Sequence, residues 1–336
     1  GRLEEALEVL EAGLPPHLAW RAEGLKGRIL ERLGRHGEAA LAYERGAELA
    51  LGLERYWLLL DAAAMWLEAG EGERALLALK EAEAAVGEED PEDAATRHYL
   101  LARAHLLLGN PGLALEEIRK ALALEEESGH KAYGTPLVEG QALLQLGRYE
   151  EAMASFREAL ARADAGERPH VLHEMGVAAL DHGAYPEAEE HLRALVREEG
   201  YPYLAQAYAD LAEALYRQGR YQEAEAAARE AVARGAVAAG ELVLGHVAYD
   251  LLHLEEALEH YRKAAESAEE GSREWVGAQE MVVDTLAQLG YRFPEEMVRR
   301  GQAVLPYLHP ADEWHAALTA YVERAQALLR EGKRLN

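Results

Sequence analysis

Residues 146–160 of the chain read LGRYEEAMASFREAL, and the same pattern returns at 33–47 (LGRHGEAALAYERGA) and at 218–232 (QGRYQEAEAAAREAV). Aligning the whole chain on this pattern places a turn residue every 33 to 39 positions, at Gly1, Gly34, Gly70, Gly109, Gly147, Gly183, Gly219 and Leu252. An alanine stands five positions after each: Ala6, Ala39, Ala75, Ala114, Ala152, Ala188, Ala224 and Ala257. A period of this length is typical of a chain of stacked structural repeats.

Residue size around the turn predicts a helical hairpin. Seven positions before the turn only small residues occur: Gly27, Ala63, Ala102, Gly140, Gly176, Ala212 and Gly245. Nine positions after it the residue is usually large: Leu10, Tyr43, Leu79, Ile118, Phe156, Leu192 and Tyr261, with Ala228 as the exception. A small residue lets two helices approach closely, and a large one fills the remaining gap. We therefore expect a helix, a tight turn and a second helix in each repeat. Since the chain is also rich in strong helix formers, we expect more than 70% helix in all and no sheet.

The composition excludes several classes of function. There is no cysteine, so protein-supplied thiolate ligands and disulfides are ruled out. The formal charge is −26, from 35 Lys and Arg against 61 Asp and Glu, and such a chain repels a phosphate backbone. The apolar runs are far shorter than the roughly 20 residues of a membrane helix. We expect a cytoplasmic protein that binds neither nucleic acid through this region nor a membrane.

The repeat resembles that of a known family. A small residue, a turn glycine, an aromatic residue two positions later (Tyr149, Tyr185, Tyr221), the alanine and a large residue are similar to the tetratricopeptide repeat, over residues 1 to about 304. The resemblance implies a right-handed α-solenoid of about eight helix-turn-helix repeats, with a concave groove that is lined by the first helices and binds a protein or peptide. Repeats longer than the usual 34 residues also resemble the sensor arms of bacterial transcription-regulating ATPases and peptide-pheromone receptors.

The two ends of the chain depart from the pattern. In residues 276–304, Phe293-Pro294 follows Gly290 and Met297 replaces the expected alanine, so this eighth repeat is degenerate. We assign 1–310 to the solenoid, and 311–336 to a C-terminal capping helix of the same domain whose apolar face we expect to consist of Trp314, Ala317, Leu318, Tyr321, Ala325, Leu328 and Leu329.

At the N-terminus the chain begins at a turn position. The first repeat is therefore expected to be truncated and the native gene product to extend before residue 1. Leu3, Leu7 and Leu10 would then expose apolar surface, through which the chain self-associates unless an upstream segment covers it.

Residues that could carry chemistry are few. His170, His173 and Glu174 have a spacing that could bind zinc, but the stronger interpretation is solvated groove residues. Ser155 lies within an expected helix, and Gly332-Lys333 lacks the phosphate-loop spacing. We therefore expect no enzyme, no metal and no cofactor.

The resemblance also implies which first-helix positions face the groove. The candidate binding residues at these positions are Arg28, Trp57, Asp61, Arg103, Gln141, His173, Glu174, Asp210, Glu213, Tyr216, His246, Tyr249 and Asp284. Trp57 could equally pack against a neighbouring repeat, whereas Trp66 is expected in the core.

The groove positions differ in charge along the chain. In the last four repeats they hold seven acids against Arg217 alone, while the first four are near neutral. The surplus could simply reflect an acidic chain, or it could attract a basic segment. We expect a non-enzymatic scaffold for a protein or peptide segment of basic character. The alternative is the effector-sensing arm of a bacterial signal-transduction or transcription regulator.

Overall fold

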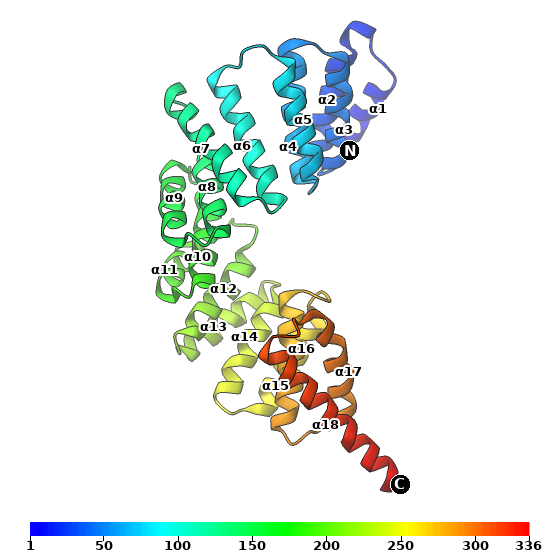
Figure 1. Cartoon of the computed structure of the whole chain (residues 1–336), viewed down its shortest axis with the longest axis vertical. Coiled ribbons are helices and arrows are strands. Elements are labelled where there is room, and N and C mark those ends of the chain that lie inside the picture. Colours follow the sequence, from blue (N-terminus) through cyan, green and yellow to red (C-terminus); the bar gives the residue numbers. More distant parts are fainter. Residues whose placement is uncertain (336) are drawn as a thin grey trace. The chain divides into compact units, whose positions relative to one another are not determined.

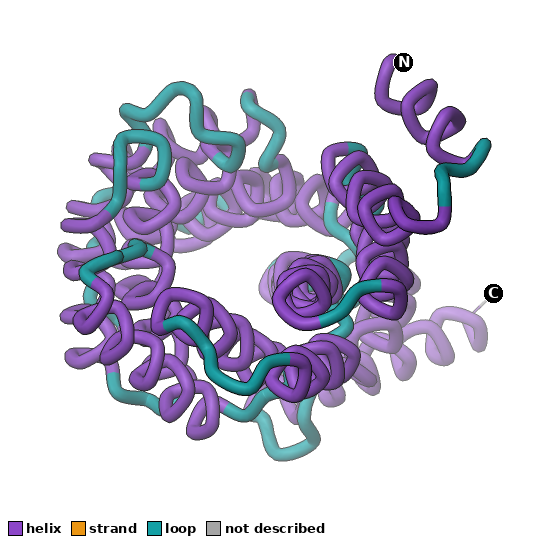
Figure 2. The backbone as a smooth tube through the Cα atoms, turned by 90° about the horizontal axis from the view of Figure 1, so that it is seen from above, coloured by secondary structure: helices purple, strands orange, loops and turns teal. Residues whose placement is uncertain are grey.

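The computed structural model describes the backbone of residues 1–335 and the side chains of residues 1–332. Of the chain, 80% is helical, and the described backbone contains 18 α-helices and no strand (Figure 2). The prediction of more than 70% helix without a sheet is confirmed. Within the described residues, no helix combines the length and the apolar character that crossing a membrane requires.

The α-helices follow one another with short connections. In chain order they are α1 (Arg2–Glu11), α2 (Ala19–Arg32), α3 (His36–Leu49), α4 (Gly52–Glu68), α5 (Gly72–Ala85), α6 (Pro91–Leu107), α7 (Pro111–Ser128), α8 (Gly134–Gln145), α9 (Tyr149–Arg162), α10 (Arg168–His182), α11 (Tyr185–Leu195), α12 (Leu204–Arg217), α13 (Tyr221–Ala233), α14 (Val237–Asp250), α15 (Leu254–Ser267), α16 (Arg273–Gln288), α17 (Pro294–Val304) and α18 (Glu313–Leu335). Two 3₁₀ turns, Pro16–Leu18 and Leu305–Tyr307, precede α2 and follow α17.

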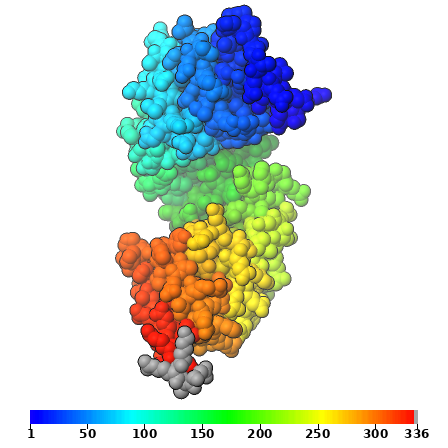
Figure 3. Space-filling model, turned by 90° about the vertical axis from the view of Figure 1, so that its right-hand side faces the viewer, coloured from blue at the N-terminus to red at the C-terminus, as the bar shows by residue number. Residues whose placement is uncertain are grey.

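The chain forms two compact units, Gly1–Val171 and Leu172–Asn336, which we call unit 1 and unit 2. Within each unit the colour in Figures 1 and 3 changes gradually, because each hairpin packs mainly against the hairpins next to it in the sequence. Each unit is thus a stack of helix-turn-helix repeats. The assignment of 1–310 and 311–336 to one domain stays a prediction, and its last residue, Asn336, lies outside the described residues.

Every hairpin turn uses the same backbone hydrogen bonds. The residue after the turn position donates its N–H to the carbonyl five residues earlier, as in Arg35 to Leu30 (2.9 Å) and Arg220 to Leu215 (3.0 Å). This closure needs a left-handed residue at the turn, and glycine adopts that conformation without a Cβ clash. Gly34 and Gly219 both have φ of 72°, and Leu252 accepts the same conformation with φ of 63°.

The predicted pairing of small and large residues is confirmed inside the hairpins. A Cβ added to Gly27 would lie 2.6 Å from Cε1 of Tyr43, and one added to Gly245 would lie 2.5 Å from Cε1 of Tyr261. The alanines five residues after the turns are fully buried from Ala39 to Ala257. Trp66 is buried as expected, and its indole N–H donates to Glu44 at 2.8 Å.

At the C-terminal end, α18 packs against α16 and α17. Leu318 and Ala325 of the predicted apolar face are fully buried. Trp314 is not part of the buried face, since 42% of it is exposed, and Val322 lies there instead. The expectation for Trp314 was wrong: it is the second residue of α18, and it stays exposed to solvent.

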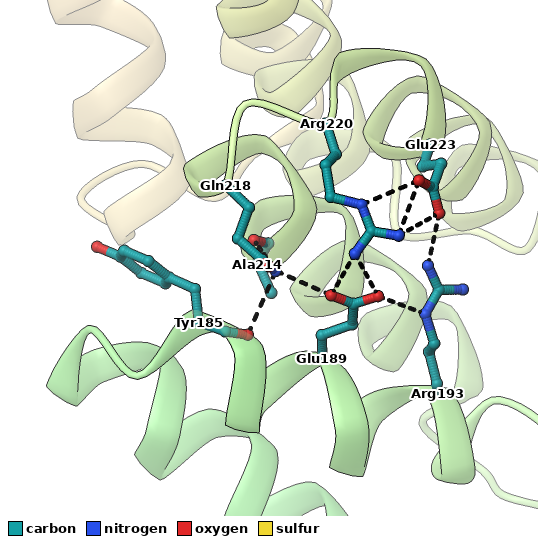
Figure 4. Close-up of polar contacts among 7 residues, drawn as sticks. All are labelled: Tyr185, Glu189, Arg193, Ala214, Gln218, Arg220 and Glu223. Carbon is teal, nitrogen blue, oxygen red and sulfur yellow. Dashed lines mark hydrogen bonds and ion pairs between the residues drawn. The ribbon is translucent and has the colours of Figure 1, made fainter.

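Neighbouring hairpins are also joined by polar side chains. Glu189 of α11 accepts hydrogen bonds from Arg193, Gln218 and Arg220, and the last two belong to the next hairpin (Figure 4). Arg193 and Arg220 both reach Glu223 of α13 as well. Burial by itself would raise the pKa of Glu189, but these hydrogen bonds outweigh it and lower the pKa. The carboxylate therefore holds two successive hairpins together.

Candidate binding grooves

A groove of about 690 Å³ lies over the first helices of unit 2, and we call it the unit 2 groove. It is lined from α10, α12, α14 and the N-terminal part of α16, and α14 packs against both α12 and α16. First helices become neighbours because each hairpin stacks on the preceding one in the same orientation. Five of the residues predicted from the sequence line this groove: His173, Asp210, Glu213, Tyr216 and His246.

One wall of the unit 2 groove is a hydrogen-bonded set around His173. Its Nε2 lies 2.9 Å from Oδ2 of Asp210, and its Nδ1 lies 2.8 Å from the Tyr201 hydroxyl. Gln206 donates to the other oxygen of Asp210 at 3.0 Å. Burial, followed by the charge of Glu174, raises the pKa of Tyr201 to about 12, so the phenol stays neutral. Both ring nitrogens of His173 are thus already engaged.

The zinc alternative at His170, His173 and Glu174 finds no support in this geometry. Within the described residues, no three side chains of the metal-binding types converge on one point. His173 turns to Asp210 instead, a partner from the next repeat that the spacing along one helix does not reveal.

Aromatic rings form the floor between α12 and α14. The ring of His246 stacks on that of Tyr216, with centroids 5.5 Å apart, and Tyr221 lies 6.0 Å beyond Tyr216. Nδ1 of His246 is 2.9 Å from the Tyr261 hydroxyl. Burial, and then the charge of Arg217, lowers the pKa of His246 to about 4. The floor is therefore flat and uncharged at neutral pH.

The charges of the unit 2 groove are mostly acidic. Arg217 donates to Glu213 at 3.2 Å, and Arg273 lies 3.7 Å from Asp181 and 4.0 Å from Glu213. Burial, together with the charge of Asp312, raises the pKa of Glu280. Arg273 was missed from the sequence because it stands at the first position of α16, outside the first-helix positions that the repeat pattern assigns to the groove.

Three of the predicted residues of unit 2 lie beside this groove rather than in its lining. Tyr249 lines a neighbouring recess of about 510 Å³ together with Tyr216 and Asp250, and its hydroxyl donates to Asp284 at 2.5 Å. Asp284 is buried, and its other oxygen accepts from Tyr321 at 3.2 Å. Both of its oxygens are thus engaged by phenols, and its role in binding a ligand stays a prediction. Glu174 lies on α10, partly buried.

The remaining five predicted residues lie in unit 1. Trp57 is 47% exposed, and its indole N–H lies 3.2 Å from Asp93 of α6. Asp61 lies on α4, and its side chain reaches solvent. Partial desolvation by neighbouring protein atoms, and then the negative charge of Glu31, raises its pKa to about 6, while the positive charge of Arg28 acts in the opposite direction. Solvent screens this exposed carboxylate, so its titration has little effect on stability. Arg103 and Gln141 line two further cavities of the same unit.

The fold and these grooves define a class: a helical-repeat protein with grooves that are lined mainly by its first helices. Tetratricopeptide repeat models match residues 95–128, 138–165 and 173–239. No curated protein matches the sequence. The chain therefore contains tetratricopeptide repeats.

Solved structures of such proteins share its fold. A signal-transduction ATPase with a tetratricopeptide repeat sensor from Pyrococcus horikoshii superposes with a TM-score of 0.67 at 16% identity, over 95% of this chain and 54% of that one. A tetratricopeptide repeat protein from Parabacteroides merdae gives a TM-score of 0.55 at 17% identity, over 80% and 98%. The Cut9–Hcn1 assembly of the APC/C gives 0.58 at 13% identity, over 96% and 59%. At these identities the likeness is one of fold.

Proposed function

We infer that this chain is a protein-interaction scaffold, the role that its tetratricopeptide repeats indicate. We propose that the unit 2 groove binds a protein or peptide segment that carries lysine or arginine, and that the chain acts without catalysis. The observation that carries this proposal is the set of charges in the groove. Five acids line it against two arginines: Asp181, Asp210, Glu213, Glu274 and Glu280 against Arg217 and Arg273.

The aromatic floor suits the same ligand. Tyr216 and the neutral ring of His246 offer flat surfaces to the alkyl stem of a lysine or to a guanidinium. A charged imidazole would repel these cations, and the low pKa of His246 removes that repulsion at neutral pH. The groove thus combines negative charge at its walls with an apolar, uncharged floor.

The test compares two matched double variants with the parent. A labelled peptide of alternating lysine and glycine is titrated by fluorescence anisotropy, with a glutamine–glycine peptide as the negative control. Asp210→Asn with Glu213→Gln should weaken binding about tenfold or more, because charge-assisted contacts contribute roughly 1.5–3 kcal/mol. Glu31→Gln with Glu68→Gln, which remove the same charge from unit 1, should leave the affinity within about twofold. Equal affinities for the two double variants would refute the proposal.

An effector-sensing arm is the second candidate function, favoured by the similarity to the sensor-bearing ATPase from Pyrococcus horikoshii. Under this alternative, the full gene product carries an ATPase segment. A small effector would then raise the melting temperature of this chain, whereas the lysine–glycine peptide would not. Differential scanning fluorimetry with both kinds of ligand separates the two candidates.

A further inference from the structure

A second groove, in unit 1, has a different chemistry. It has a volume of about 550 Å³ and is lined from the first helices α4, α6 and α8. We call it the Arg103 groove and define it by Leu67, Arg103, Leu106, Leu107, Gln141 and Leu144. It continues into a larger cavity of about 670 Å³, with which it shares Arg103 and Gln141. The basic and acidic side chains of that larger cavity balance, three against three.

The leucines give this groove an apolar wall that solvent reaches. Leu67 is 8% exposed, Leu106 and Leu144 are partly buried, and Leu107 is 48% exposed. The leucine surface that remains in water gains free energy when an apolar side chain covers it, at about 25 cal/mol for each Å² removed from water. The wall therefore favours an occupant with an aliphatic or aromatic side chain.

Among the described residues that line this groove, Arg103 is the only charged one. Its Nη2 donates to Oε1 of Glu68 at 2.8 Å, and its guanidinium lies over the Tyr99 ring, 5.8 Å from the centroid. The side chains of Arg103 and Glu68 are 32% and 45% exposed. Such an exposed pair contributes little free energy. A carboxylate from a ligand can therefore take the place of Glu68 on the guanidinium.

We propose that the Arg103 groove binds a peptide segment of a partner protein in which an apolar side chain adjoins a carboxylate. Its charge preference is opposite to that of the unit 2 groove. The inference does not depend on the proposed function, because it concerns other residues, the other unit and an acidic rather than a basic ligand. The scaffold would then hold two segments of opposite charge, one in each unit.

The test uses a fluorescein-labelled peptide of alternating leucine and glutamate, with two matched peptides in which serine replaces leucine or lysine replaces glutamate. The leucine–glutamate peptide should bind the parent chain at least about tenfold more tightly than either of the others. Arg103→Gln should weaken its binding about tenfold, because the charge-assisted hydrogen bond is lost. Glu68→Gln should strengthen it severalfold, since the internal competitor for the guanidinium is removed.

Arg119→Gln serves as the control, because Arg119 pairs with Glu139 on α7 and α8, outside the lining of the groove, and it should leave the affinity unchanged. The gain expected for Glu68→Gln cannot arise from unfolding, so loss of structure does not imitate the result. The proposal is overturned if the leucine–glutamate peptide does not bind, if the three peptides bind equally, or if Glu68→Gln and Arg103→Gln change the affinity in the same direction.

Discussion

At the scale of single residues, a hairpin depends on positions where nothing larger than alanine fits. Ala152 is fully buried, five residues after the turn at Gly147, whereas Ala154 is exposed on the same helix. The two positions have the same residue and the same helix propensity, so they differ only in packing.

Leucine at these two positions measures that packing. Ala152→Leu should destabilise the protein by about 1–3 kcal/mol through overpacking. Ala154→Leu should change the stability by no more than about 0.5 kcal/mol, as is usual at a surface site. Thermal melts followed by circular dichroism compare the pair, and equal melting temperatures would show that the repeat is wrongly registered.

His246 provides a second residue-scale prediction, through pH. Burial holds its pKa at about 4 in the folded chain against 6.5 for an unperturbed histidine. The unfolded chain therefore binds a proton between these pH values and the folded chain does not, so this contribution to stability, up to about 3 kcal/mol, is present above pH 6.5 and is lost as the pH falls to about 4. The denaturant midpoint of His246→Gln should fall less over this range than that of the parent. Parallel pH profiles would contradict the assignment.

At the scale of the elements, the recurring turn and the contact inside each hairpin were predictable from the sequence. Gly27 and Tyr43 stand in fixed register to Gly34, and one register repeated along the chain encodes one local geometry. Contacts between hairpins were not predictable in this way. The pairing of His173 with Asp210 and the position of Arg273 near Glu213 depend on how separate helices stack, and no period of the sequence records that.

Glu189 tests the polar link between hairpins. Glu189→Gln removes the charge that accepts from Arg193 and Arg220, and it should cost about 1–2 kcal/mol. Glu225→Gln is the matched control, since Glu225 pairs with Arg229 at the surface of α13 and should cost less than about 0.5 kcal/mol. Hydrogen exchange should quicken at the start of α13 in the first variant alone. Unchanged exchange there would mean that the network is not a structural link.

At the scale of the whole molecule, the chain carries a formal charge of −26, and the candidate groove residues separate into two sets with different chemistry. The excess of acids at the later groove positions was visible in the sequence. The boundary between unit 1 and unit 2 after Val171 was not visible in the sequence, because the repeat pattern runs through it without a break. Nor was the apolar wall beside Arg103, which three first helices build together.

Salt should weaken the binding of a basic peptide in the unit 2 groove, because the proposed contacts there are between opposite charges. Raising the ionic strength from about 0.1 M to 1 M shortens the Debye length from roughly 10 to 3 Å. The affinity of the lysine–glycine peptide should fall by about tenfold or more over this range, and most of the loss should disappear in the Asp210→Asn, Glu213→Gln double variant. Isothermal titration at a series of salt concentrations measures both. An affinity of the parent that does not change with salt would exclude an electrostatic groove.

The central claim, that a basic segment lies in the unit 2 groove, is tested most directly by photo-crosslinking. A lysine–glycine peptide with a benzophenone at its centre is irradiated with the parent chain, and the attachment sites are located by mass spectrometry. We expect crosslinks to residues of α10, α12, α14 and the start of α16, and their loss in the Asp210→Asn, Glu213→Gln variant. Crosslinks that fall in unit 1, or that persist in this variant, would contradict it.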